Sequence, residues 1–78
     1  MNQNQKIAAF VNTGAEITPL SAMMNLGVAR LASRVHEINE KLAWIGHPKL
    51  TVTMKRTANS KRYAAYRGHV PSGLINYL

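Results

Sequence analysis

The chain has 78 residues and no cysteine, and its ten Lys and Arg outnumber three Asp and Glu, which gives a formal net charge of +7. A chain of this length folds as one domain with a small core, too small for a typical enzyme cleft. The lack of cysteine excludes disulfides and thiolate metal sites, and the apolar runs are far shorter than the ~20 residues of a membrane-spanning helix. Residues 1–6, MNQNQK, lack a hydrophobic signal core, so we expect a cytoplasmic protein.

The charges are segregated along the chain. Glu16, Glu37 and Glu40 are the only acids, and every charged residue after Glu40 is basic. A compact positive region attracts polyanions, of which DNA and RNA are the commonest. The alternative is a solvated basic surface that only favours solubility. Segregation of the charge, rather than mixing, favours the polyanion partner.

A first helix is predicted over residues 2–13. Asn2 or Asn4 caps its first turn. Its apolar side consists of Ile7, Ala8, Phe10 and Val11. Gly14 suits the left-handed position after a helix, and residues 16–18 are expected to be extended.

A second, shorter helix is predicted from Pro19 to residues 25–27. Thr18 is its cap, and proline at the first helical position loses no useful hydrogen-bond donor. We interpret its apolar stripe as part of the core; the stripe consists of Leu20, Met23 and Met24.

A third helix is predicted from Val28 or Ala29 to about Ala43. Its buried face consists of Val28, Leu31, Val35, Ile38 and Leu42. Its other faces carry Arg30, Ser33, Arg34, Glu37 and Glu40. Trp44 and Ile45 are expected to cover the core at the end of this helix, before a Gly-His-Pro break.

A β-hairpin is predicted over residues 50–67. The buried face of its first strand consists of Leu50, Val52 and Met54, which alternate with polar residues. Residues 57–60 have turn chemistry, and the strand returns over residues 63–67. Residues 69–78 form an apolar tail that either packs back on the domain or joins a partner.

This order of elements is that of a winged helix-turn-helix, an α+β fold, over residues 1–68. A short second helix supports the third so that its outer face stands clear and fits the major groove of DNA. Arg30 and Arg34 are predicted on neighbouring turns of one side, where arginine pairs bidentately with guanine. Cations at the hairpin tip suit a phosphate backbone or a minor groove. The candidate DNA-binding residues are Ala29, Arg30, Ser33, Arg34, Lys55, Arg56, Lys61 and Arg62.

The segment GAEITPLSAMMNLGVARLASRVHEINE, followed by GHPKLTVT and SKRYAAYR, resembles a small helix-turn-helix family frequent in bacteriophage and prophage genomes. The resemblance covers about residues 14–67 and is carried by the T-P-L-x-A and R-L-A-x-R pieces. It implies that Arg30 and Arg34 belong to a recognition helix and that Lys61 and Arg62 belong to a wing. Two features depart from the family pattern: a longer stretch before the G-H-P turn, and the residues after Gly68.

No motif predicts catalysis or a cofactor. His36, His47 and His69 are scattered without carboxylates at ligand spacing, so we expect no metal site. There is no Gly-rich phosphate loop and no pair of carboxylates beside a nucleophile. We therefore interpret the chain as a non-enzyme without cofactors.

Two functions of different class remain open. The first is a phage-encoded transcriptional regulator in the host cytoplasm that binds double-stranded DNA, as a homodimer if binding is tight, because one winged helix buries little DNA surface. The tail is the candidate surface for this dimer. The second is a phage effector that binds and inhibits a host protein of nucleic-acid metabolism, which an exposed apolar tail would favour. RNA binding is a weaker third option, because few aromatics are available for base stacking. The charges of the third helix also permit a simple self-paired face, since Glu37 follows Arg34 by three residues.

Overall fold

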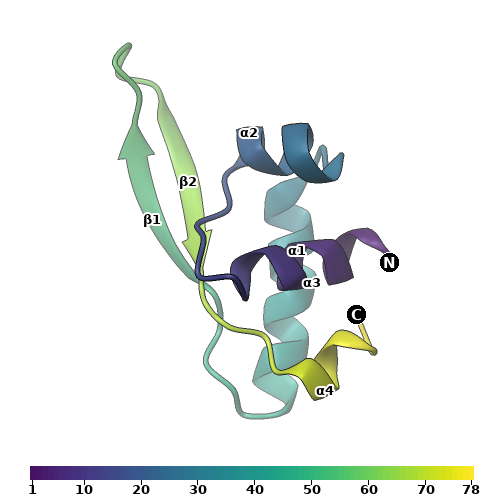
Figure 1. The fold of residues 1–78 in the computed structure, drawn as a ribbon. Coiled ribbons are helices and arrows are strands. Elements are labelled where there is room, and N and C mark those ends of the chain that lie inside the picture. Colours follow the sequence, from purple (N-terminus) through teal and green to yellow (C-terminus); the bar gives the residue numbers. More distant parts are fainter.

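Three helical segments and a hairpin follow one another in the predicted order, and a fourth short helix closes the chain (Figure 1). This computed structural model describes residues 1–78. The elements are α1 (Gln3–Val11), α2 (Pro19–Ser21) continued by the π-helical turn η1 (Ala22–Leu26), α3 (Leu31–Trp44), β1 (Thr51–Arg56), β2 (Arg62–Arg67) and α4 (Ser72–Ile75). The predicted α+β class is therefore confirmed. None of the helices is both long enough and apolar enough to cross a membrane.

Side-chain caps fix the starts of the first two helices. The Asn2 Oδ1 atom accepts a hydrogen bond from the Gln5 amide at 2.8 Å, and the Gln5 side chain accepts one from the Asn2 amide at 3.0 Å. Thr18 Oγ1 accepts from the Ser21 amide at 3.1 Å, directly before Pro19. Both caps satisfy amides that the helix leaves free, so the predicted starts are confirmed.

The apolar stripe of α3 lies in the centre of the core. All five predicted stripe residues are at most 3% exposed: Val28, Leu31, Val35, Ile38 and Leu42. They join one cluster with Ile7 and Val11 of α1, which crosses in front of α3 (Figure 1). The cluster also includes Ile17, from the extended piece before α2. The outer face of α3 is therefore the side that bears the polar residues.

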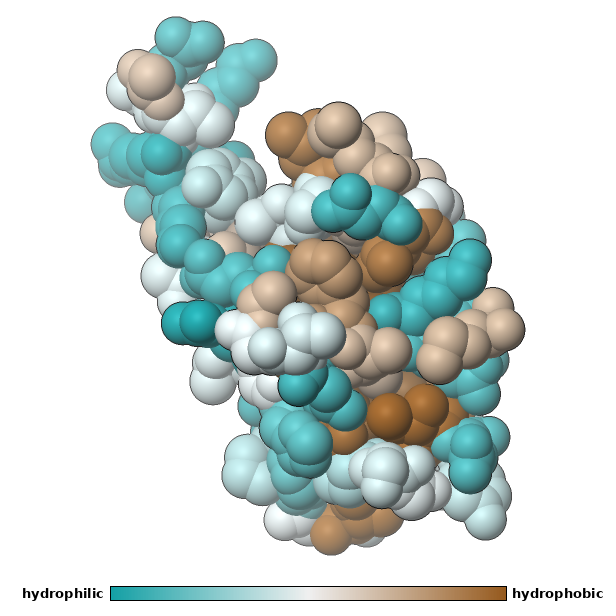
Figure 2. Space-filling model, in the orientation of Figure 1, coloured by the Kyte–Doolittle hydropathy of each residue, from teal (hydrophilic) through white to brown (hydrophobic).

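The prediction for the apolar stripe of the second helix is wrong. Leu20, Met23 and Met24 are each more than half exposed, and Ala22 is the residue of α2 and η1 that is fully buried. These side chains face solvent together, and the segment packs on the core through Ala22 instead. The hydrophobic surface at the top of Figure 2 lies over this helix.

The third helix begins later than predicted, at Leu31. Gly27 takes the left-handed conformation, with φ of 69°, and ends η1. Arg30 has φ of −128° and ψ of 65°, outside the helical region. The chain uses Ala29 and Arg30 to pass from the buried Val28 to the first helical turn, so these two residues precede α3 and do not lie on its face.

Trp44 and Ile45 do not cover the core, contrary to the prediction. Trp44 is 90% exposed and Ile45 is more than half exposed. Their place in the core is taken by Leu50, before β1, and by Val70 and Leu74 from the tail.

The predicted hairpin is confirmed, but of its predicted buried face only Leu50 is buried. β1 and β2 pair antiparallel from Thr51–Arg67 to Arg56–Arg62. Val52 and Met54 are more than half exposed, because the hairpin projects away from the helices (Figure 1) and only Ala65 is buried within its strands. Ile17 and Tyr66 exchange two backbone hydrogen bonds, of 2.9 and 2.8 Å, which attach β2 to the body.

The tail packs back on the domain. The Asn12 side chain makes two hydrogen bonds of 2.8 Å with the backbone N–H and C=O of Val70. The Gln5 side chain donates from Nε2 to the carbonyl oxygen of Ile75 at 3.1 Å. Val70 and Leu74 join the core and Tyr77 stays exposed, so only a small apolar part of the tail is accessible to a partner of the kind that the effector alternative requires.

Replacing Gly68 by alanine is expected to destabilise the fold by about 1–3 kcal/mol through overpacking. The added β-carbon would lie 2.7 Å from Cδ2 and 3.3 Å from Cα of Leu50. Gly73→Ala is the matched control, because no atom lies within 4 Å of its added β-carbon and alanine favours helix. Urea unfolding measures both variants, and equal free energies of unfolding would contradict the close contact at the base of the hairpin.

Candidate nucleic-acid interface

The residues at the start of α3 form one continuous polar surface. Arg30, Ser33 and Arg34 line an open depression together with Ala32, His36 and Glu37. Three of the four residues predicted here are thus brought together, and Ala29 is exposed directly before them. His36 was missing from the prediction, although its position three residues after Ser33 places it on the same side.

The two arginines of this surface differ in their surroundings. No hydrogen bond or ion pair holds the Arg30 guanidinium, whereas Arg34 donates to Gln3 Oε1 at 3.1 Å and to Glu37 Oε1 at 3.0 Å. Both partners in the Arg34–Glu37 ion pair are close to half exposed, so the pair contributes at most about 1 kcal/mol. Arg34 is therefore held in place but remains free to exchange Glu37 for another anion.

The cations of the hairpin divide between its two faces. Directly paired residues of an antiparallel ladder share a face, so Arg56 and Arg62 lie side by side on one face and Lys55 lies on the other, opposite Tyr63. Like charges placed directly opposite each other are destabilising. Neither arginine has an acidic partner. An anion between the two guanidinium groups would remove this repulsion.

Lys55 forms an ion pair within the molecule, unlike Arg56 and Arg62. Its Nζ atom lies 2.6 Å from Glu16 Oε1. This hydrogen bond, together with the charges of Lys55 and Arg67, holds the pKa of the Glu16 carboxyl below its usual range, against a smaller opposing effect of desolvation. Arg67 also donates to the carbonyl oxygen of Gly14 at 3.1 Å. Lys55 and Arg67 thus fasten the hairpin to the segment that leads into α2.

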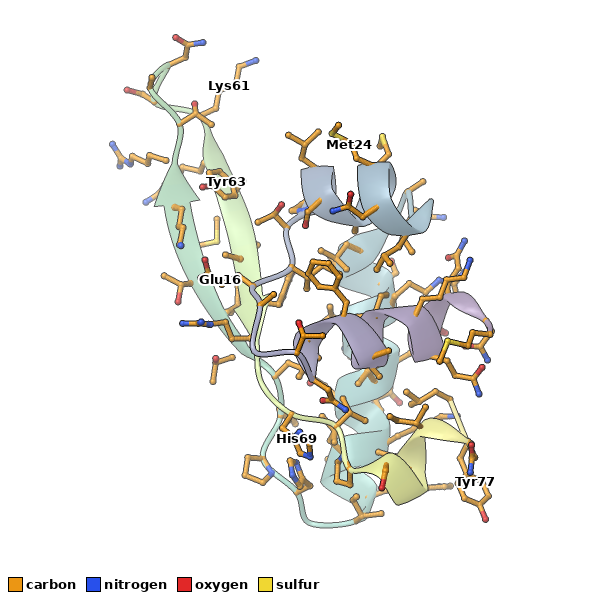
Figure 3. The ribbon with its side chains drawn as sticks, in the orientation of Figure 1. Glu16, Met24, Lys61, Tyr63, His69 and Tyr77 are labelled. Carbon is orange, nitrogen blue, oxygen red and sulfur yellow. The ribbon has the colours of Figure 1, made fainter.

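The hairpin tip carries Lys61 in a fixed turn. The Thr57 amide donates to the Lys61 carbonyl at 2.9 Å, and Ser60 takes the left-handed conformation with φ of 63°. Lys61 lies at the outer end of the hairpin, at the same end of the molecule as Met24 (Figure 3). The N-terminal end of α3 lies at that end too (Figure 1), so one end of the molecule bears both sets of free cations.

The histidines do not form a cluster. His36 Nε2 lies 2.9 Å from Glu40 Oε1 on the surface of α3. The rings of His47 and His69 are 6.3 Å apart near the loop before β1, and His47 Nδ1 lies 2.8 Å from the carbonyl oxygen of Pro48.

Comparison with known families agrees with this geometry. Residues 2–67 match the model of a winged helix-turn-helix domain family, so the chain belongs to that family. Membership implies DNA binding, and domains of this family are typically not enzymes. Neither the search of curated proteins nor that of solved structures finds a match.

Removing the Lys55 ammonium is expected to change how stability depends on pH. Because Glu16 has a lowered pKa in the folded state, its interaction stabilises the fold above about pH 4.3, the usual carboxyl value, and is lost as the pH falls through the lower folded value. In Lys55→Gln the free energy of unfolding should therefore decline less steeply below about pH 5 than in the wild type. Urea unfolding at pH 3 to 7 measures this.

Glu16→Gln is the control for this experiment. It removes the titrating group itself, so its curve should be at least as flat as that of Lys55→Gln. Wild-type steepness in both variants would show that the ion pair does not fasten the hairpin.

Proposed function

We propose that the protein is a small regulator of transcription, phage-encoded and cytoplasmic in the host, that binds double-stranded DNA. Membership of the winged helix-turn-helix family supports DNA binding. The observation that supports this use of the fold most directly is the location of the cations that have no acidic partner. The unpartnered Arg30 and the adjacent Arg56 and Arg62 lie toward one end of a chain of net charge +7.

In this proposal the first turns of α3 read base edges in the major groove. Ser33 is exposed in the first turn and forms hydrogen bonds with any base, whereas Arg30 reaches in from just before the helix. Arg34 exchanges Glu37 for guanine or phosphate. Glu37 and Glu40, further along α3, repel phosphates, so the contact is confined to the N-terminal half of the helix.

The hairpin holds the phosphate backbone. A phosphate between Arg56 and Arg62 removes the repulsion of the two guanidinium groups and gains charge-assisted hydrogen bonds. Lys61 at the tip extends this contact. Lys55 takes no part, because Glu16 holds its charge. The hairpin therefore sets affinity and position but carries no sequence preference.

Substitutions in the two regions are expected to have different effects on binding. Arg30→Ala should weaken a specific site by about 1–3 kcal/mol with little effect on random DNA. Arg62→Ala should weaken both equally and reduce the slope of log affinity against log salt by about 0.9. Fluorescence anisotropy on a site selected from random DNA, at two or more salt concentrations, measures both effects.

Lys6→Ala is the charge-matched control, because it removes one exposed cation from α1 that is not part of the proposed contact; Lys6 borders a depression with Arg34 but not with Arg30. Its affinity should change only slightly. If all three variants lost affinity equally, net charge alone would account for binding. If Arg30→Ala and Arg62→Ala both kept wild-type affinity, the proposed interface would be wrong.

A protein partner is the second candidate, and it is favoured by the exposed apolar stripe of α2 and η1. Exposed methionines adapt to varied partner surfaces, and Leu20, Met23 and Met24 form such a stripe. Binding of a host protein through this stripe should be lost in Met23→Gln/Met24→Gln, with DNA affinity unchanged. A pull-down from nuclease-treated host lysate tests this candidate, which fails if no stoichiometric protein is retained by the wild type.

A further inference from the structure

The end of α3 carries a large apolar side chain that does not pack in the core. Trp44 is the single tryptophan of the chain and is 90% exposed, and Ile45 beside it is more than half exposed. Tryptophan is highly buried on average, because its large apolar surface is costly to hydrate. Trp44 also borders a depression, whose other lining includes Leu78 from the tail. An indole and an adjacent recess thus occur on one surface.

The charges around Trp44 are of both signs. Glu40 and Lys49 line the same depression. Glu40 is the one carboxylate of the chain without a Lys or Arg partner, since its contact is His36, and Lys49 has no acidic partner. Elsewhere the free charges are cationic, so two copies repel each other over most of their surfaces. This region therefore carries charges of both signs that can pair between two copies.

We propose that a second copy of the chain covers this surface in a symmetric dimer. A two-fold contact brings the same patch of both copies together, so it must complement itself. The Trp44 indole of each copy enters the recess beside Trp44 of the other, and Glu40 of each faces Lys49 of the other. Opposite charges within one patch are required when the patch binds its own copy, but not when it binds a different protein. They therefore favour a second copy over a host protein.

The position of the contact agrees with DNA recognition, and this step rests on the proposed function. Ser33, Glu37, Glu40 and Trp44 share one side of α3, at spacings of four, three and four residues. Ser33 and Trp44 are about 16 Å apart along the helix at 1.5 Å per residue. A two-fold axis beside Trp44 and perpendicular to α3 places the two first turns about 33 Å or more apart. Half-sites of dimeric helix-turn-helix proteins are about 34–36 Å apart.

Sedimentation equilibrium of the full chain without DNA tests the dimer. The wild type should sediment at twice the 8.6 kDa chain mass. Trp44→Ala should raise the dissociation constant about 30-fold, as expected for a central tryptophan. Met54→Ala, which truncates an exposed apolar side chain on the hairpin, is the matched control and should leave the mass unchanged. A wild type that is still monomeric at 100 μM overturns the proposal. This limit is on the order of the largest dissociation constant at which the dimer would be relevant.

A charge exchange tests the arrangement of the two copies. Glu40→Lys and Lys49→Glu should each weaken the dimer by placing like charges opposite each other, and the double variant should restore it. Trp44 emission should shift to shorter wavelength as concentration rises, because its surroundings become less polar. A double variant no better than the single ones, or emission independent of concentration, overturns the pairing. None of these results depends on DNA, so they are independent of the proposed function.

Discussion

The burial of one side of α3 is the interaction on which the rest of the structure depends. Leu31, Val35, Ile38 and Leu42 pack under α1 and beside the tail, and each such side chain contributes about 1.5–3 kcal/mol when buried. The surface ion pair on the same helix contributes at most about 1 kcal/mol. The apolar stripe therefore determines how α3 is rotated, and it turns Ser33, Glu40 and Trp44 outward.

The hairpin depends on the same core and is attached to the body from its base as far as Lys55. The Ile17–Tyr66 backbone pair, the Glu16–Lys55 ion pair and the contact of Gly68 with Leu50 hold it. Beyond these contacts it projects into solvent, where Arg56 and Arg62 face each other without an acid. A structure that keeps two such cations adjacent loses stability when alone and gains it when an anion binds. That property is what a contact with phosphate requires.

Much of this fold can be read from the sequence where local chemistry decides it. The caps at Asn2 and Thr18, the stripe of α3 and the presence of the hairpin follow from hydrogen bonding and periodicity within short segments. The DNA-binding role follows from the segregated charge and from the order of the elements. The candidate DNA-binding residues were chosen on the same grounds and stay a prediction; the start of α3 was placed too early, which put Arg30 on the helix.

What the sequence does not reveal depends on distant contacts. The spacing of Leu20, Met23 and Met24 does not show that the segment turns π-helical or that Ala22 is the residue that packs in the core. The tail replaces Trp44 as the cover of the core because the Asn12 side chain holds Val70, a pairing 58 residues apart in the chain. Lys55 has the same residue type as the free cations, and only the hairpin register shows that it faces Glu16.

NMR titration of the chain with its selected DNA site tests the central claim most directly. If the first turns of α3 and the hairpin hold the duplex, amide shifts should change at residues 29–36 and 56–62, while those of α4 and the inner side of α1 stay in place. Shifts that change first on α1 and α4, or that stay unchanged throughout at saturating DNA, would contradict it.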